Sequence, residues 1–103
     1  MSEFIKIGKI SDINVNSIKP FNVNGIPVAV ANLNGEFFAV ADTCTHDGGE
    51  LGEGEVVGEC CVECPRHGGR FNLKTGQVKA LPPTVPIKTY EVKVEGEDIL
   101  VKV

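Results

Sequence analysis

The sequence predicts an all-β protein whose antiparallel strands close on themselves as a small β-barrel or sandwich. Apolar runs of six to eight residues are separated by Asn24-Gly25 and Asn34-Gly35, and Asn-Gly favours two-residue hairpin turns. Apolar and polar residues alternate from Tyr90 to Val94 and again from Ile99, as in half-buried strands. No segment has the period of a long helix, and Asp12 to Ser17 has room for a turn or two at most.

The strands are expected in chain order, each justified by an apolar run bounded by turn residues. The two Asn-Gly pairs make the second, third and fourth strands a meander. Thr75-Gly76 turns the fifth strand onto the sixth, and Glu95-Gly96-Glu97 joins the last two. The expected strands are Phe4 to Ile10, Ile18 to Val23, Ile26 to Leu33, Glu36 to Ala41, Arg70 to Leu73, Gln77 to Leu81, Tyr90 to Val94 and Ile99 to Val103.

Size and charge bound the class of protein. The chain has 103 residues and a mass of 11.0 kDa, which predicts a single domain, 1–103, with a modest core. Its 10 Lys and Arg against 14 Asp and Glu give a formal charge of −4, so nucleic acid is not an expected partner. No apolar run approaches the roughly 18 residues of a membrane span, and the N-terminus lacks a signal-peptide pattern. We expect a cytoplasmic protein with no membrane partner.

Two short segments hold both histidines and two of the four cysteines. The first hook, Cys44-Thr45-His46, and the second hook, Cys64-Pro65-Arg66-His67, are separated by seventeen residues. Each hook offers one thiolate and one imidazole to a shared metal centre. Two irons bridged by sulfide could bind all four donors, with the thiolates on one iron and the imidazoles on the other. The spacing therefore predicts a [2Fe–2S] cluster with the ligands Cys44, His46, Cys64 and His67.

Other sites remain open for the same residue types. Two Cys and two His also satisfy a tetrahedral zinc, although zinc fingers usually pair Cys with Cys and His with His. Cys61-Val62-Glu63-Cys64 reads as Cys-X-X-Cys, and Cys60 and Cys44 would complete a four-cysteine site. That arrangement leaves both histidines without a role. The mixed hooks favour the two-iron cluster.

The two hooks and their surroundings resemble the small soluble Rieske-type ferredoxins that feed electrons to bacterial ring-hydroxylating oxygenases. The similarity covers nearly the whole chain, including Cys44 to Gly49, Cys64 to Asn72 with Thr75-Gly76, and the proline-rich Leu81 to Pro86. The resemblance implies the Rieske iron–sulfur fold, with a cluster-binding subdomain at about residues 42–72 inserted into a base of flanking strands. It also implies a one-electron carrier, not an enzyme, between an NAD(P)H-dependent flavoprotein reductase and a terminal oxygenase or similar acceptor.

The resemblance also implies a low reduction potential. High-potential Rieske proteins carry an extra cysteine after each hook, and a serine and a tyrosine whose hydroxyls bond to sulfur. The matching positions here are Gly49, Arg66, Gly69 and Phe71. Hydrogen bonds to the sulfurs stabilise the added electron, so we expect a potential within roughly 100 mV of the lower end of the Rieske range, about −150 to +300 mV.

Half of the acidic residues crowd around the first hook, in a stretch without Lys or Arg. Such a run is either a solvated loop face or a rim that steers a basic partner to the redox site. The residues are Asp42, Asp47, Glu50, Glu53, Glu55, Glu59 and Glu63.

Catalysis within the chain is not expected. A mononuclear oxygen-activating iron needs further ligands, typically two histidines and a carboxylate, and the cluster uses both histidines of the chain. Three functional alternatives remain: a Rieske-like small subunit of an assimilatory nitrite reductase, a structural zinc module, and a redox sensor built on Cys60 and Cys61.

Overall fold

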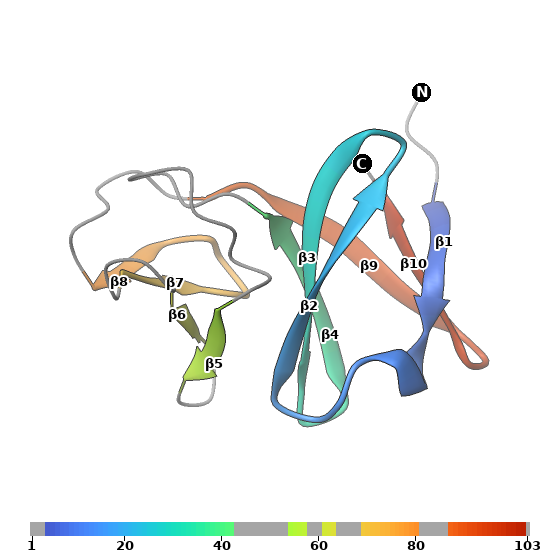
Figure 1. Cartoon of the computed structure of the whole chain (residues 1–103), viewed down its shortest axis with the longest axis horizontal. Helices are drawn as coiled ribbons and strands as arrows, with labels where there is room; N and C mark the ends of the chain where they lie inside the picture. Colours follow the sequence, from blue (N-terminus) through green and yellow to red (C-terminus); the bar gives the residue numbers. More distant parts are fainter. Residues whose placement is uncertain (1–3, 43–53, 58–60, 64–68, 81–86, 103) are drawn as a thin grey trace.

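The structure, a computed structural model, describes residues 4–42, 54–57, 61–63, 69–80 and 87–102. Within these ranges it contains ten strands and one short 3₁₀ helix (Figure 1). In the same ranges, no helix is long and apolar enough to cross a membrane. The elements are β1 (Phe4–Lys9), η1 (Ile10–Asp12), β2 (Ser17–Val23), β3 (Ile26–Leu33), β4 (Glu36–Ala41), β5 (Glu55–Val57), β6 (Cys61–Glu63), β7 (Arg70–Asn72), β8 (Val78–Ala80), β9 (Thr89–Glu95) and β10 (Asp98–Lys102).

Six strands form the base of the molecule. They pair antiparallel in the order β1-β10-β9-β4-β3-β2, and the sheet curls so that its two edge strands come into contact (Figure 1). Apolar side chains fill the inside of this curl. They are Ile13, Val23, Val28, Val30, Ala39, Ile99 and Val101.

Four short strands form a second antiparallel sheet, in the order β5-β6-β7-β8. It packs on the opposite face of β3 and β4, where a second core buries Ala29, Ala31, Leu33, Val40, Val62, Phe71, Leu73 and Ile87. β3 therefore supplies side chains to both cores, and this explains why its sequence is a continuous apolar run and does not alternate. The all-β prediction is confirmed.

The two predicted Asn-Gly hairpins are confirmed in detail. Asn24 and Gly25 have φ of 51° and 85°, and Asn34 and Gly35 have φ of 54° and 96°. Positive φ at both central residues is what a twisted two-residue hairpin requires. An asparagine two positions before each turn accepts a hydrogen bond from the turn glycine, Asn22 at 2.7 Å and Asn32 at 2.8 Å.

Three expectations need correction. β1 ends at Lys9 and not at Ile10, because Ile10 begins the 3₁₀ helix and the Asp12 carboxylate accepts a hydrogen bond from the Lys9 amide at 2.8 Å. The strands β5 and β6 were not expected. Val94, expected to be half-buried, is 45% exposed. β9 pairs with β4 only at Thr89 and Tyr90, so from Glu91 onward it pairs with β10 alone.

Candidate metal centre

The four predicted ligands, Cys44, His46, Cys64 and His67, lie outside the described residues. The structure therefore locates the candidate centre through the strands that bound the two hook-bearing segments. Among the described residues, no group of three or more His, Cys, Asp or Glu side chains is arranged to hold a metal ion.

One end of the four-stranded sheet is the attachment point of both hook-bearing segments. Glu55 pairs with Glu63, Glu63 with Arg70, and Arg70 with Ala80, so these four residues form one continuous row, here called the terminal rung. Glu55 follows the segment that contains the first hook. Glu63 and Arg70 flank the six residues that contain the second hook, and Ala80 precedes the proline-rich segment. The antiparallel topology thus delivers three segments to the same edge.

The first hook-bearing segment leaves the base at a well-anchored point. The Asp42 amide donates to the Pro27 carbonyl at 3.2 Å, and the Ala41 amide donates to the Lys88 carbonyl at 2.9 Å. Lys88 follows the proline-rich segment, so that segment ends beside the start of the first hook-bearing segment. Asp42 is only 7% exposed. It therefore does not belong to the exposed acidic rim that the sequence suggested.

The second hook lies in the connection between β6 and β7, and contacts on both faces of these strands hold the pair together. On the inner face Val62 and Phe71 are opposite each other and completely buried. On the outer face the Arg70 Nε and Nη2 atoms lie 3.0 and 2.9 Å from the Glu63 Oε2 atom. Sequence reasoning missed this ion pair. The sequence feature that could have indicated it is an acidic residue, Glu63, directly before the second hook and a basic residue, Arg70, six residues after Cys64.

The return of the proline-rich segment is fixed at Gly76, in the turn between β7 and β8. The Ile87 amide donates to the Gly76 carbonyl at 2.9 Å. Gly76 has φ of +78°, and a Cβ atom there would lie 2.1 Å from the Ile87 carbonyl oxygen. Only glycine suits this position, because the backbone is left-handed and another chain segment passes against it.

Comparison with known proteins identifies the family. Residues 3–91 match the family described as Rieske [2Fe-2S] domain. The chain belongs to the Rieske family. This membership gives the cofactor class, a Rieske-type [2Fe–2S] cluster, and confirms the resemblance drawn from the two hooks. Two thiolates and two imidazoles are the donor set that such a cluster requires.

Three similar proteins place the chain more closely within the Rieske family. The ferredoxin component of biphenyl 2,3-dioxygenase from Rhodococcus jostii is 42% identical over 93% of this chain and 89% of its own. The ferredoxin of carbazole 1,9a-dioxygenase from Nocardioides aromaticivorans superposes with a TM-score of 0.91, at 31% identity and 95% coverage of both chains. A chain in the complex of reduced oxygenase and oxidized ferredoxin of carbazole 1,9a-dioxygenase superposes with a TM-score of 0.88. It is 37% identical, and the match covers 95% of this chain and 91% of that chain.

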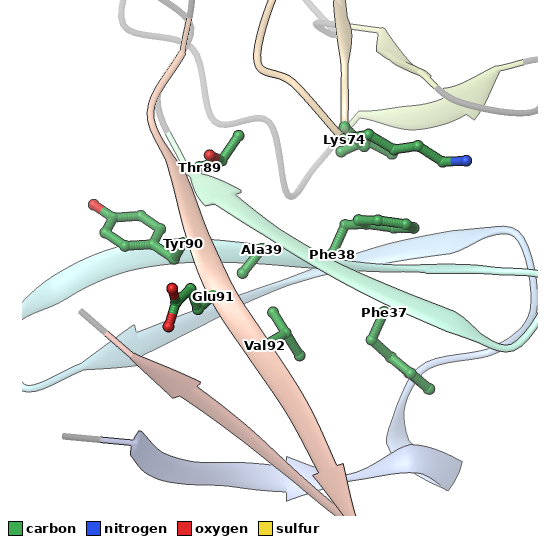
Figure 2. A pocket seen from close by; sticks show the side chains of 9 residues that line it. Phe37, Phe38, Ala39, Lys74, Thr89, Tyr90, Glu91 and Val92 are labelled. Atoms are coloured by element: carbon green, nitrogen blue, oxygen red, sulfur yellow. The ribbon is translucent and has the colours of Figure 1, made fainter.

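A groove of about 270 Å³ lies between the base and the turn that joins β7 to β8. Figure 2 shows the side chains that line it. Phe37, Phe38, Tyr90 and Val92 of the base line one side of it, and Leu73 and Lys74 of the β7–β8 turn line the other. The Lys74 ammonium lies 5.7 Å from the centre of the Phe38 ring. This turn is at the end of the four-stranded sheet opposite the terminal rung.

Cys61 is separate from the proposed ligand set. It lies in β6 opposite Asn72 and is 8% exposed. Cys61 therefore fills a core position, whereas its neighbour Cys60 lies outside the described residues.

Proposed function

We propose that this chain carries single electrons from an NAD(P)H-dependent flavoprotein reductase to a terminal oxygenase or similar acceptor. The observation that carries this proposal is the match to the Rieske family together with relatives that are named ferredoxin components of dioxygenases and span nearly the whole chain. Its role is therefore that of an electron carrier and not of a catalyst. The solved complex of oxygenase and ferredoxin in carbazole 1,9a-dioxygenase supports the oxygenase as acceptor. The reductase as donor and the cytoplasm as location are inferred from the resemblance.

The proposed ligands are Cys44 and Cys64 on one iron and His46 and His67 on the other. The terminal rung supports this set, because it brings the ends of both hook-bearing segments to one edge of the sheet. When bound, the cluster supplies a one-electron couple without making or breaking a substrate bond. The two neutral imidazoles leave more positive charge on their iron than thiolates do. His46 and His67 would therefore make the iron that they hold the easier one to reduce.

The low potential proposed from the sequence has support in the second core. Phe71 is completely buried beside Val62 and has no hydroxyl to donate to a sulfur. Gly69 has no side chain at all. Without these donors the reduced state is less stabilised, which suits an electron acceptor for a reductase that uses NAD(P)H.

Electron transfer from reductase to oxygenase is the direct test. The chain is mixed with NADH and the reductase and oxygenase components of biphenyl 2,3-dioxygenase, and ring hydroxylation is followed as the chain is titrated. We expect product formation to require the chain and to rise with its concentration. The proposal would be contradicted if the chain held its cluster but exchanged electrons with neither the reductase nor the oxygenase component.

The alternatives have less support. Redox-sensor thiols are solvent-accessible, whereas Cys61 is 8% exposed. The zinc module does not account for the family match. In the remaining alternative, the same electron-carrying site belongs to the small subunit of a nitrite reductase and passes its electrons to that enzyme.

We also propose the division into a base and a cluster-binding subdomain at about residues 42–72. The separate four-stranded sheet supports it, although that sheet continues as far as Ala80.

A further inference from the structure

The terminal rung carries three charged side chains on one face of the sheet. Residues directly opposite each other on neighbouring strands share a face, so Glu55, Glu63 and Arg70 stand side by side in that order. Two opposed glutamates repel each other. Arg70 is the cation next to the inner glutamate of this row, and it offsets the charge of Glu63.

The contact between Arg70 and Glu63 is close and specific. Two guanidinium nitrogens, Nε and Nη2, converge on one carboxylate oxygen at 3.0 and 2.9 Å. The two side chains are 49% and 35% exposed, and an ion pair this exposed contributes at most about 1 kcal/mol to folding stability. Stability is therefore a weak reason for this arrangement.

The location of the pair suggests a different role. Glu63 is bonded directly to Cys64, a proposed cluster ligand, and Arg70 begins β7 on the other side of the second hook. Adjacent Cα atoms are about 3.8 Å apart, so the Glu63 carboxylate stands within about 10 Å of Cys64, or one Debye length at 0.1 M salt. A lone negative charge at this range opposes the uptake of an electron.

The strand pairing also holds Arg70 in place from its other side. Arg70 pairs with Ala80 of β8, and the register between β7 and β8 shifts directly after it, from Arg70 opposite Ala80 to Phe71 opposite Val78. Such a bulge re-aims the side chains next to it and is common near functional sites. Arg70 is thus fixed between the strand that precedes the second hook and the strand that precedes the proline-rich segment.

We propose that Arg70 is a positioning residue that holds the Glu63 carboxylate in a charge-neutral pair and thereby sets the reduction potential of the cluster. The inference rests on the proposed function, because it requires a cluster bound at the second hook. The two charges of the pair have opposite effects on the potential and largely cancel while both are present.

Single and double substitutions separate the two charges. The midpoint potential is measured by redox titration for the parent, R70Q, E63Q and E63Q/R70Q, together with the iron content and the urea midpoint of each cluster-containing protein. R70Q leaves Glu63 uncompensated and is expected to shift the potential to more negative values. E63Q leaves Arg70 uncompensated and is expected to shift it to more positive values, and the double variant is expected to return toward the parent.

A matched ion pair in the six-stranded base, outside the terminal rung, serves as control. Lys6 and Asp98 join β1 to β10 at 3.3 Å with side chains 56% and 39% exposed, so K6Q/D98N removes a pair of similar exposure. It is expected to leave the potential unchanged.

The outcomes distinguish failure of the proposed role of Arg70 from failure of the proposed electron-carrying function. A parent protein without a two-iron cluster would overturn the proposed function itself. A parent with its cluster, and R70Q and E63Q with unchanged potentials or shifts of the same sign, would overturn only the role of Arg70. If R70Q does not fold, E63Q decides alone: a positive shift supports the inference, and an unchanged or negative shift overturns it.

Discussion

At the residue scale, the ligand types proposed for the cluster would decide where an added electron resides and how readily it is accepted. Imidazole is a neutral ligand, whereas thiolate adds a negative charge to its iron. Each exchange of His for Cys in the hooks therefore makes reduction harder.

His46→Cys and His67→Cys are each expected to lower the reduction potential from the parent value, itself near the lower end of the Rieske range, toward the about −400 mV of plant-type four-cysteine clusters. Redox titration measures the shift. Cys60→Ser is the control and should leave the visible spectrum unchanged, since Cys60 is not a proposed ligand. Loss of that spectrum would contradict the ligand set.

Gly76 is the second residue on which the site depends. Gly76→Ala is expected to cost about 3 kcal/mol or more, because φ is +78° and the new Cβ would meet the Ile87 carbonyl oxygen at 2.1 Å. Gly25→Ala is the matched control, with φ of +85° and no atom within 4 Å, and should cost about 1 kcal/mol. Urea unfolding of both variants gives the comparison. Equal costs would show that the contact with Ile87 contributes nothing.

At the element scale, the short strands of the second sheet are stable only because they pack on the base. β5, β6, β7 and β8 have three residues each, too few for an isolated sheet. Their inward side chains meet the small side chains of Ala29 and Ala31 on β3, which allow the two sheets to approach closely.

Val62→Ala removes two methyl groups from this contact and is expected to destabilise the protein by about 2 kcal/mol, because the cavity left behind is in a fully buried core. Val94→Ala, at a position 45% exposed, is the control and should change stability by less than about 0.5 kcal/mol. Thermal or urea unfolding measures both. A small effect at Val62 would mean that the second sheet is not held by this core.

The same elements show how far sequence reasoning reached. The Asn-Gly hairpins could be predicted because the turn is encoded by neighbouring residues that tolerate positive φ. β5 and β6 could not, because three-residue strands carry almost no period and their pairing is set by contacts distant in sequence. The hooks could be predicted from residue type and spacing alone. The terminal rung, which brings their ends together, appears only once strand register is known.

At the scale of the whole molecule, charge is divided unevenly along the chain. Residues 42–63 contain seven acidic residues and no Lys or Arg, whereas the remainder, with all ten basic residues and seven acidic ones, carries +3. Glu55 of this acidic segment is exposed on the terminal rung. The acidic residues are thus concentrated in one segment of the sequence. Negative charge that is exposed beside a redox site steers a basic partner surface.

Glu55→Gln is expected to slow association with the oxygenase component, and the difference from the parent should shrink as salt rises, because steering by exposed charges is screened. Stopped-flow reoxidation at several ionic strengths measures the rate. Glu97→Gln, an exposed change in the β9–β10 turn, is the control and should have little effect. Equal rates for both variants would assign the acidic run to a solvated surface.

The central claim is that the two hooks hold a mixed Cys and His two-iron cluster. The measurement that tests it most directly is the EPR spectrum of the dithionite-reduced protein, with iron and zinc content determined on the same sample. We expect two irons per chain and a rhombic signal with the low average g of a cluster with nitrogen ligands. Two irons with the spectrum of an all-cysteine cluster, or zinc with no signal, would contradict it.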